Sequence, residues 1–464
     1  MPGYAPLTDD RLWLPRGTTH AAPRPGGEFV LYWMQVTHRA HDNFALNHAI
    51  EQANTLGVPV LVYHGLRHDY PWASDRLHTF ILQGVRDLMA AFAARGIQYA
   101  FYLDDRDPGE TGERPSPLVA LAERAALVVT DWFPTFIMPR QLKALRERVG
   151  VPVVAVDSAL VIPAKRLTKS YSAARWIRPD LMGPLGDWLL PIETVEPEVR
   201  RPIDLPFAVT EPGEDIAALV AACDIDHDVP PARGWTGGTR AAQARLDWWL
   251  EHGLPRYLER NDPNVDVTSR MSPWLHFGHV SVHEVLLAAR EAGPAEPWKK
   301  FLDETLTWRE LAFNFCRFQP KHRTVEAIPD WARTELADHE DDPREAIYSD
   351  EQLERGETDD ELWNACQQAY LRDGWMHNYL RMLWGKSVIG WTENAARALR
   401  ILEHLNNKYA LDGRDPNSYG GILWCFGRFD RPFFRRPIYG TVRYMSTNAA
   451  RKKFDVPAYI RSMA

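Results

Sequence analysis

The chain has 464 residues, of which 45% are hydrophobic and 25% are charged, and its formal net charge is −8. These values are typical of folded globular proteins and exclude disordered and fibrous chains. At about 150 residues per domain, the length predicts two or three domains.

The sequence shows no targeting or membrane segment and no cysteine framework. The first residues lack the apolar stretch of a signal peptide, and no run of about 18 apolar residues occurs. We therefore expect a cytoplasmic protein. The four cysteines have no CxxC spacing, so they fit neither a zinc site nor a set of disulfides. We expect no metal, and buried, reduced thiols at Cys223, Cys316, Cys366 and Cys425.

Short β-branched and aromatic runs alternate with helical patterns in the first third of the chain. The first helix is expected to start at Asp42 as N-cap and to end at Gly57. Strands that alternate with helices predict a doubly wound parallel sheet, a Rossmann-like α/β domain. No GxGxxG follows the first strand, so the usual Rossmann grip on a dinucleotide is not expected. The predicted strands lie at residues 29–33, 59–64, 97–103, 127–132 and 151–156.

The strand pattern ends before the middle of the chain. Residues 161–235 are rich in proline and are expected to form an interdomain connector. Residues 1–27 are expected to be a tail, residues 28–160 the α/β domain and residues 236–464 an all-helical domain. Long helices are expected within that last domain at 242–260, 281–292, 298–318, 359–390 and 393–408.

Charge is distributed unevenly along the chain. Residues 421–464 carry nine Lys/Arg against two Asp, whereas the remainder carries 45 Lys/Arg against 60 Asp/Glu. A basic face on an acidic protein is typical of a polyanion binder. A solvated C-terminal face explains the same numbers equally well.

A polar segment in the helical half suits a phosphate ligand. Thr268, Ser269, Arg270 and Ser272 fall within five positions near an expected helix start. Hydroxyls, backbone amides and a guanidinium at such a place can cradle a diphosphate. Clusters of Ser and Thr are nevertheless more often caps or turns.

Two pairs of residues are spaced to share a helix face. Glu304 precedes Trp308 by four residues, and Asn378 precedes Met382 by four. A carboxyl, an indole, an amide and a thioether in one cavity would suit a flat, partly polar substrate such as a pair of bases. On these residues alone, ordinary amphipathic helices are the stronger interpretation.

Tryptophan is abundant, with 18 copies. Trp384 and Trp391 are seven residues apart, which places them two turns along one helix face, and Trp363 comes from the preceding helix. The three indoles form either an electron-transfer chain or a packed stripe.

Six segments together carry a resemblance to a known family: residues 32–46, 260–278, 304–316, 375–386, 405–424 and 439–446. They resemble the photolyase/cryptochrome family, specifically class II cyclobutane pyrimidine dimer photolyases, from about residue 28 to the C-terminus. The resemblance implies an antenna α/β domain and a helical FAD-binding domain. It also implies light-driven repair, a carbon–carbon lyase reaction in which reduced FAD passes an electron to a dimer flipped out of DNA. It leaves open whether a second chromophore of the 8-hydroxy-deazaflavin type is present.

The same resemblance assigns roles to residues. The lesion pocket would be formed by Glu304, Asn378, Met382, Trp308 and Trp424, with Glu304 stabilising the electron-bearing dimer in a dry site. Electrons would reach FAD through Trp384, Trp363 and Trp391. FAD would be held by Tyr257, Thr268, Ser269, Arg270, Met271, Ser272, Arg309, Arg381, Asn406, Asp412 and Asp415. Damaged DNA is the expected partner of a monomer, with contacts from Arg260, Asn261, Arg431 and Arg443.

One loop departs from the class II pattern. Class II enzymes usually have His-Asp-Arg-Ala-Trp after the pocket tryptophan, whereas this chain has Phe429, Asp430, Arg431, Pro432 and Phe433. The loop is expected to enter the space that the flipped lesion leaves in DNA, so the departure affects the handling of duplex DNA and not the flavin site.

Two other functions remain as alternatives. A cryptochrome-like photoreceptor would bind FAD without repair, and Glu304 argues against it. A (6-4) photolyase would need an acid–base histidine near the lesion, for which His377 gives weak support.

Overall fold

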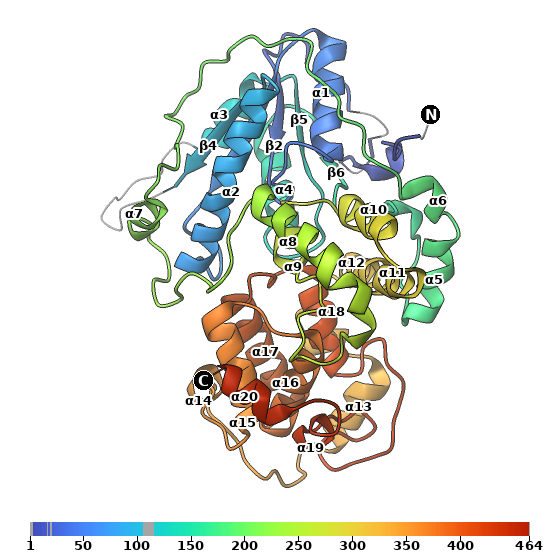
Figure 1. The fold of residues 1–464 in the computed structure, drawn as a ribbon. Helices are drawn as coiled ribbons and strands as arrows, with labels where there is room; N and C mark the ends of the chain where they lie inside the picture. The colour runs from blue at the N-terminus through green and yellow to red at the C-terminus, as the bar shows by residue number, and fades with distance from the viewer. Residues whose placement is uncertain (1–2, 16, 19–20, 105–115, 464) are drawn as a thin grey trace.

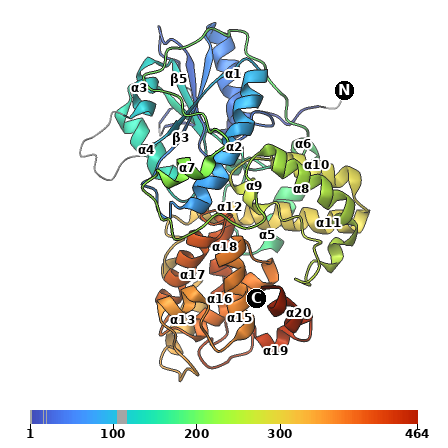
Figure 2. The ribbon, with the colours of Figure 1, turned by 60° about the vertical axis from the view of Figure 1, so that its left-hand side comes forward.

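The structure, a computed structural model, describes residues 3–15, 17–18, 21–104 and 116–463. A sheet with helices on both faces forms one end of the molecule, and helices alone form the other end (Figures 1 and 2). The predicted fold class, an N-terminal parallel α/β domain followed by a helical region, is confirmed.

The sheet has six strands in the order β1-β6-β5-β2-β3-β4. Five are parallel, and each overlaps a predicted strand: β2 (Val30–Trp33), β3 (Val60–Leu66), β4 (Gln98–Leu103), β5 (Leu127–Asp131) and β6 (Val153–Val156). The sixth, β1 (Leu12–Trp13), pairs antiparallel with β6 and was not predicted. Two residues are too few to show an alternating pattern.

Both faces of the sheet are covered. Helices α1 (Phe44–Leu56) and α2 (Asp75–Ala94) pack on one face, and α3 (Pro117–Arg124) and α4 (Met138–Arg148) pack on the other. Burial on both faces explains why the strands read as continuous apolar runs.

The first helix ends as predicted and begins one residue later than predicted. Gly57 closes α1 with φ 65°, a conformation that L-residues rarely adopt. The N-cap is Asn43, whose side chain accepts the Leu46 N–H, so the assignment to Asp42 is wrong. Asp42 instead accepts the Ser281 hydroxyl at 3.0 Å.

Short helices and an extended segment follow the sheet: η2 (Ala164–Arg166), α5 (Ala174–Met182), α6 (Leu185–Trp188) and α7 (Ile216–Ala221). Between α6 and α7 the chain runs along the outside of the sheet and its helices (Figure 1). The Gln98 side chain donates to the Ile203 carbonyl and accepts the Ile203 N–H, both at 2.8 Å. Asn47 donates to the Glu193 carbonyl at 2.5 Å. Side chains of the sheet region therefore hold this proline-rich segment in place.

The first group of helices in the C-terminal half leads to the predicted pocket glutamate. It comprises α8 (Thr239–His252), η3 (Leu254–Glu259), α9 (Ser272–His276), α10 (Val282–Ala292), α11 (Ala295–Leu302), the π-helical turn η4 (Asp303–Trp308) and α12 (Arg309–Phe318). α2 lies beside α8 in the turned view (Figure 2). The helix predicted at 298–318 is thus interrupted by a π turn, and the one predicted at 242–260 ends at Gly253.

The second group of helices forms the far end of the molecule (Figure 1). It comprises η5 (Val325–Ala327), α13 (Asp330–Asp338), α14 (Asp350–Arg355), α15 (Glu361–Gln368), the π turn η6 (Ala369–Asp373), α16 (Asn378–Gly390), α17 (Ala395–Tyr409), α18 (Pro416–Cys425), α19 (Thr447–Ala450) and α20 (Val456–Met463). The helix predicted at 359–390 is broken after η6 by Gly374, with φ 65°. The short 3-10 turn η1 (Asp9–Arg11) lies in the N-terminal tail.

All four cysteines are buried and free, as predicted. Across the described ranges, no helix combines the length and apolar character needed to cross a bilayer. Those same ranges contain no group of His, Cys, Asp and Glu side chains arranged to hold a metal ion.

A buried arginine joins the two ends of the molecule. Arg76, at the start of α2, has no solvent exposure. Its guanidinium donates to the carbonyls of Tyr370 at 2.7 Å, Leu371 at 2.6 Å, Tyr409 at 2.6 Å and Pro230 at 3.0 Å. One side chain from the sheet region thus satisfies carbonyls of η6 and α17.

Arg76→Met should strongly destabilise the protein, because it leaves four buried carbonyls without their donor. We expect a loss of at least about 3 kcal/mol in the free energy of unfolding, measured by urea denaturation. Arg67→Met is the control, since Arg67 is half-exposed and pairs with Asp69. It should change stability by no more than about 0.5 kcal/mol. Equal losses of unfolding free energy in the two variants would show that Arg76 does not stabilise the contact between the two ends of the molecule.

Candidate functional site

Two indoles form one wall of the predicted pocket. Trp308, at the end of η4, stacks on Trp424 of α18 with ring centroids 4.6 Å apart and planes 14° from parallel. Within the described part of the chain, the buried indole N–H of Trp424 finds no acceptor. An unpaired buried donor costs about 1–3 kcal/mol. The stacked pair therefore offers a flat apolar surface.

Glu304 lies at the rim of this site. Its carboxylate contacts Lys300 Nζ at 2.7 Å and Arg260 Nη2 at 3.5 Å, and its side chain is 30% exposed. The carboxylate is thus paired and partly exposed in this structure, and its role in a dry, lesion-bound site stays a prediction.

The N-terminus of α16 completes the rim. His377 caps α16, accepting the Tyr379 N–H through Nδ1, and its Nε2 donates to the Arg260 carbonyl at 2.9 Å. This bond places the exposed Asn378 near Arg260 and hence near Glu304.

The half-buried Met382 lies one turn further along α16 than Asn378. The Cys425 thiol donates to its carbonyl at 4.0 Å, next to Trp424. These contacts place Met382 beside Trp424, and Asn378 near Arg260.

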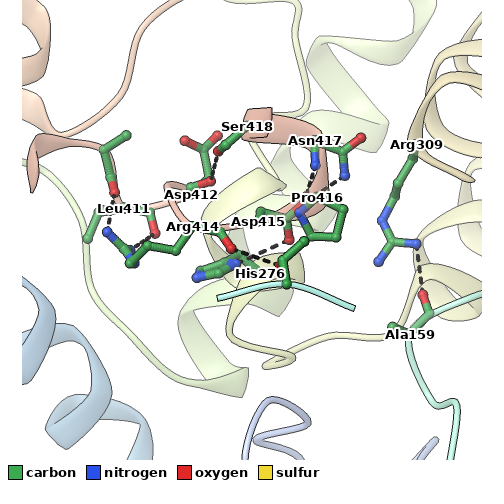
Figure 3. A network of polar contacts seen from close by, with 12 residues as sticks. Ala159, His276, Arg309, Leu411, Asp412, Arg414, Asp415, Pro416, Asn417 and Ser418 are labelled. Atoms are coloured by element: carbon green, nitrogen blue, oxygen red, sulfur yellow. Dashed lines mark hydrogen bonds and ion pairs between the residues drawn. The ribbon is translucent and has the colours of Figure 1, made fainter. Parts of the chain in front are cut away.

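A buried polar network holds the loop before α18 (Figure 3). Asp415 caps α18 and receives a hydrogen bond from His276 Nδ1 at 3.1 Å. Burial alone would raise the pKa of Asp415, but the His276 hydrogen bond and the charge of Arg309 hold it below its usual value. Arg309 donates to the Ala159 carbonyl at 2.7 Å and so ties this network to the end of the sheet domain.

Arg381 and Asn406 adjoin the same loop. Arg381 Nη2 donates to both carboxylate oxygens of Asp412, at 2.9 and 2.8 Å. Asn406 is buried, accepts the Tyr370 hydroxyl at 3.2 Å and donates to Asn407 at 3.2 Å. Four of the predicted flavin ligands, Asp412, Asp415, Arg381 and Asn406, therefore lie around one loop.

The predicted phosphate segment lies beside a cavity. Arg245 donates to the carbonyls of Thr268 and Ser269, and Arg270 adopts φ 56°. Arg270 borders a cavity of about 350 Å³, a size within the range of ligand sites. Guanidinium and aromatic groups dominate its lining, namely Arg233, Arg245, Arg270, Arg372, Trp235, Trp274, Trp375, His377 and Tyr459.

The other residues assigned to this segment lie differently. Ser272 is the first residue of α9 and is half-buried. Tyr257 and Met271 are packed in the apolar core, where Tyr257 makes edge contacts with Trp249 and Phe301. Of the segment 268–272, only Arg270 faces the cavity.

The three predicted chain tryptophans are in contact. Trp384 and Trp363 are parallel with centroids 6.2 Å apart, and Trp363 meets Trp391 edge-on at 5.4 Å. The Trp363 indole N–H donates to the Trp384 carbonyl at 3.0 Å, and the Trp384 N–H donates to Gln367 at 3.0 Å. The indoles lead from the buried Trp384 to the half-buried Trp391.

The loop after α18 is basic and exposed. The guanidinium groups of Arg431 and Arg443 both lie 5.6 Å from the Phe433 ring, and both residues are exposed, as is Asn261. Phe434, beside them, is 93% exposed. Phe429 instead turns inward with φ 66° and packs edge-on against Phe315.

Glu310 was missed in the sequence. It is buried, and one carboxylate oxygen accepts the N–H groups of Val161 at 2.7 Å and Ile162 at 3.3 Å. Burial raises its pKa to about 8. The available signal was a carboxylate on the apolar face of α12, four residues after Leu306 and three before Phe313.

Glu310→Gln should remove a pH dependence of stability. In the unfolded chain a glutamate titrates near pH 4.3, so between about pH 4.3 and 8 the folded protein holds a proton that the unfolded chain has lost. The free energy of unfolding should therefore fall as pH rises through this window, by up to about 1.4 kcal/mol per pH unit. Urea unfolding across the window should give a shallower fall for Glu310→Gln. The exposed Glu147→Gln should behave like the parent protein; a parallel pH profile for Glu310→Gln would contradict the buried, protonated state.

Comparisons with known proteins give the same family throughout. The sequence pattern of the DNA photolyase family matches residues 30–181. A deoxyribodipyrimidine photo-lyase of Methanothermobacter thermautotrophicus is 36% identical over 94% of this chain and 94% of its own length. One from Oryza sativa is 36% identical over 94% of this chain and 87% of its own length. A cryptochrome structure from Synechocystis has a TM-score of 0.67, 16% identity and coverage of 96% of this chain and 89% of that one, which shows a shared fold.

Proposed function

The chain belongs to the DNA photolyase family, and we propose that it splits cyclobutane pyrimidine dimers in DNA by light-driven electron transfer to a flipped-out lesion. It is a carbon–carbon lyase of the deoxyribodipyrimidine photo-lyase type. The observation that carries this conclusion is 36% identity over nearly the whole of both chains. The cryptochrome likeness concerns the fold alone and does not favour a photoreceptor.

The donor set fits FAD, the cofactor of this family. Guanidinium groups around the cavity beside Arg270 suit a diphosphate, because Arg binds phosphate through paired N–H groups. The Arg381–Asp412 pair and the Asn406 amide offer donors and acceptors to a ring system with polar edges. Once bound and reduced, FAD supplies an electron to the dimer after absorbing blue or near-UV light.

The stacked indoles bind the lesion. Trp308 and Trp424 present an apolar surface on which the flipped bases lie. A damaged pair is already weakened, so removing it from the helix costs less than removing an intact pair. Met382 and Asn378 close the pocket from α16.

Glu304, Arg260 and Lys300 stabilise the negative charge that the lesion carries after it accepts an electron. The dimer is neutral until it accepts an electron, and its carbonyls are then negative. Glu304 holds Arg260 and Lys300 in place at this rim, so that their N–H groups can face the carbonyls of the dimer, and without the carboxylate both long side chains are free to turn away. Fixed charges that stabilise a charge present only in the reacting state raise the yield of the reaction more than they raise the affinity for the lesion.

Illumination of the reduced protein with dimer-containing DNA tests the proposed function, with a dark sample as control. Glu304→Ala should lower repair per absorbed photon by about tenfold, the effect of about 1.4 kcal/mol of lost stabilisation. Lesion affinity should change much less. The matched control is Glu296→Ala on α11, because Glu296 forms an exposed pair with Lys299. Equal losses of affinity and yield in Glu304→Ala would assign Glu304 to binding alone.

The exposed arginines should contribute affinity that does not depend on the lesion. Arg431→Ala and Arg443→Ala should weaken binding to damaged and intact DNA alike, because both side chains point to solvent from a basic loop. Each should reduce the slope of log affinity against log salt by about one. Arg333→Ala serves as control, since Arg333 pairs with Asp330 on the acidic helix α13. Unchanged slopes would remove these arginines from the DNA interface.

A further inference from the structure

A tyrosine extends the row of indoles beyond Trp391. The ring of Tyr348 meets Trp391 edge-on with centroids 5.3 Å apart, and the Tyr348 N–H donates to the Trp391 carbonyl at 3.3 Å. Tyr348 is 8% exposed. It therefore lies as close to Trp391 as Trp363 does, on the outer side of the row.

The hydroxyl of Tyr348 is bound to a carboxylate. It donates to Asp359 Oδ2 at 3.0 Å and accepts the Asp359 N–H at 3.0 Å. Burial raises the pKa of Tyr348, so the phenol is protonated at neutral pH and its proton is directed at Asp359. Asp359 itself is exposed and can exchange a proton with water.

The same turn positions the middle indole. Asp360, the next residue, caps α15 by accepting the N–H groups of Leu362 and Trp363, both at 3.0 Å. Adjacent carboxylates thus fix both Tyr348 and Trp363.

A second phenol at the other end of the row lacks these features. Tyr370 meets Trp384 edge-on at 5.4 Å and is fully buried. Its hydroxyl donates to Asn406, an amide that does not take up a proton at neutral pH. Oxidation of a phenol releases its proton, so a phenol beside a carboxylate is the better electron donor. The contrast singles out Tyr348.

We propose that Tyr348 and Asp359 form the outer end of the electron chain, with Tyr348 reducing oxidised Trp391 while its phenolic proton passes to Asp359. The Trp391 radical cation gains one electron and becomes neutral indole. The Tyr348 O–H bond breaks, leaving a neutral tyrosyl radical, and Asp359 becomes a carboxylic acid that releases the proton to water. A thiol in solution then returns a hydrogen atom to Tyr348. This inference rests on the proposed function, because Trp391 is oxidised when its electron moves inward through Trp363 and Trp384.

The consequence is a longer-lived separation of charge. A radical cation at Trp391 can take its electron back from the inner end of the row. A neutral tyrosyl radical must first regain a proton, so the return is slower and more electrons stay at the flavin.

Flash photolysis with electron paramagnetic resonance tests the pair in the FAD-loaded, oxidised protein. The parent protein should give a tyrosyl radical. Tyr348→Phe keeps the ring contact but has no phenolic proton, so a tryptophan radical should appear in place of the tyrosyl radical and should decay faster, by charge return. Asp359→Asn keeps a hydrogen-bond acceptor and removes the base, so tyrosyl formation should slow. A tyrosyl signal of unchanged size in Tyr348→Phe would overturn the proposal.

The matched control is Tyr171→Phe. Tyr171 also donates to a carboxylate, that of Asp180, and its ring contacts none of the three indoles. This variant should keep the parent signal. Loss of the signal in Tyr171→Phe would show that the radical lies elsewhere and would reject Tyr348.

Pulse radiolysis of the FAD-free protein separates this inference from the proposed function. Azide radicals oxidise indoles in solution, and transfer to tyrosine is followed by absorbance. Tyr348→Phe and Trp391→Phe should both lose the same transfer phase, whether or not the protein repairs DNA. Suppose that Tyr348 reduces Trp391 in the FAD-free protein but the flavin of the FAD-loaded protein is not photoreduced. This result would support the Tyr348–Asp359 pair and reject electron transfer from Trp391 through Trp363 and Trp384 to the flavin. Transfer that is unaltered in both variants would reject the pair itself.

Discussion

The guanidinium of Arg76 is the contact on which the geometry of the site depends. It has four carbonyl partners: Tyr370 and Leu371 lie in the last turn before the helix ends at Gly374, and Tyr409 is the last residue of α17. Such ends carry partial negative charge, so carbonyl dipoles meet the buried cation. Tyr370 in turn binds Asn406 and packs on Trp384. A shift of α2 would therefore move the start of the indole row and the candidate flavin ligands together.

The sheet also contacts the helical half of the molecule at its topological switch point. Doubly wound sheets bind ligands where the strand order reverses, here between the carboxyl ends of β2 and β5. That position is filled by Asp131, which accepts the N–H groups of Gln35, Val36 and Thr37 at 2.9, 2.9 and 3.1 Å. The chain then continues to Arg39, which donates to the Gly278 carbonyl at 3.0 Å in the helical half. An internal carboxylate thus occupies the anion site, which agrees with the missing glycine motif.

Features with a local signal could be predicted, and features made by distant contacts could not. The five parallel strands were predictable because burial on both faces gives unbroken apolar runs. The π turns were not, because one extra residue hardly changes helical spacing. The contact of Glu304 with Arg260, which is remote in sequence, was not predictable either. Tyr348 is remote in sequence from Trp391, so no spacing rule indicated their contact.

The two π turns, η4 and η6, lie next to residues with different proposed roles. In a regular helix Glu304 and Trp308 would lie one above the other on the same face. In η4 Glu304 pairs back to Lys300, four residues earlier, while Trp308 stacks on Trp424. The turn η6 acts similarly at the other wall, because it presents Tyr370 to Trp384 before Gly374 redirects the chain into α16. π turns are frequent at functional sites because they displace side chains without ending a helix.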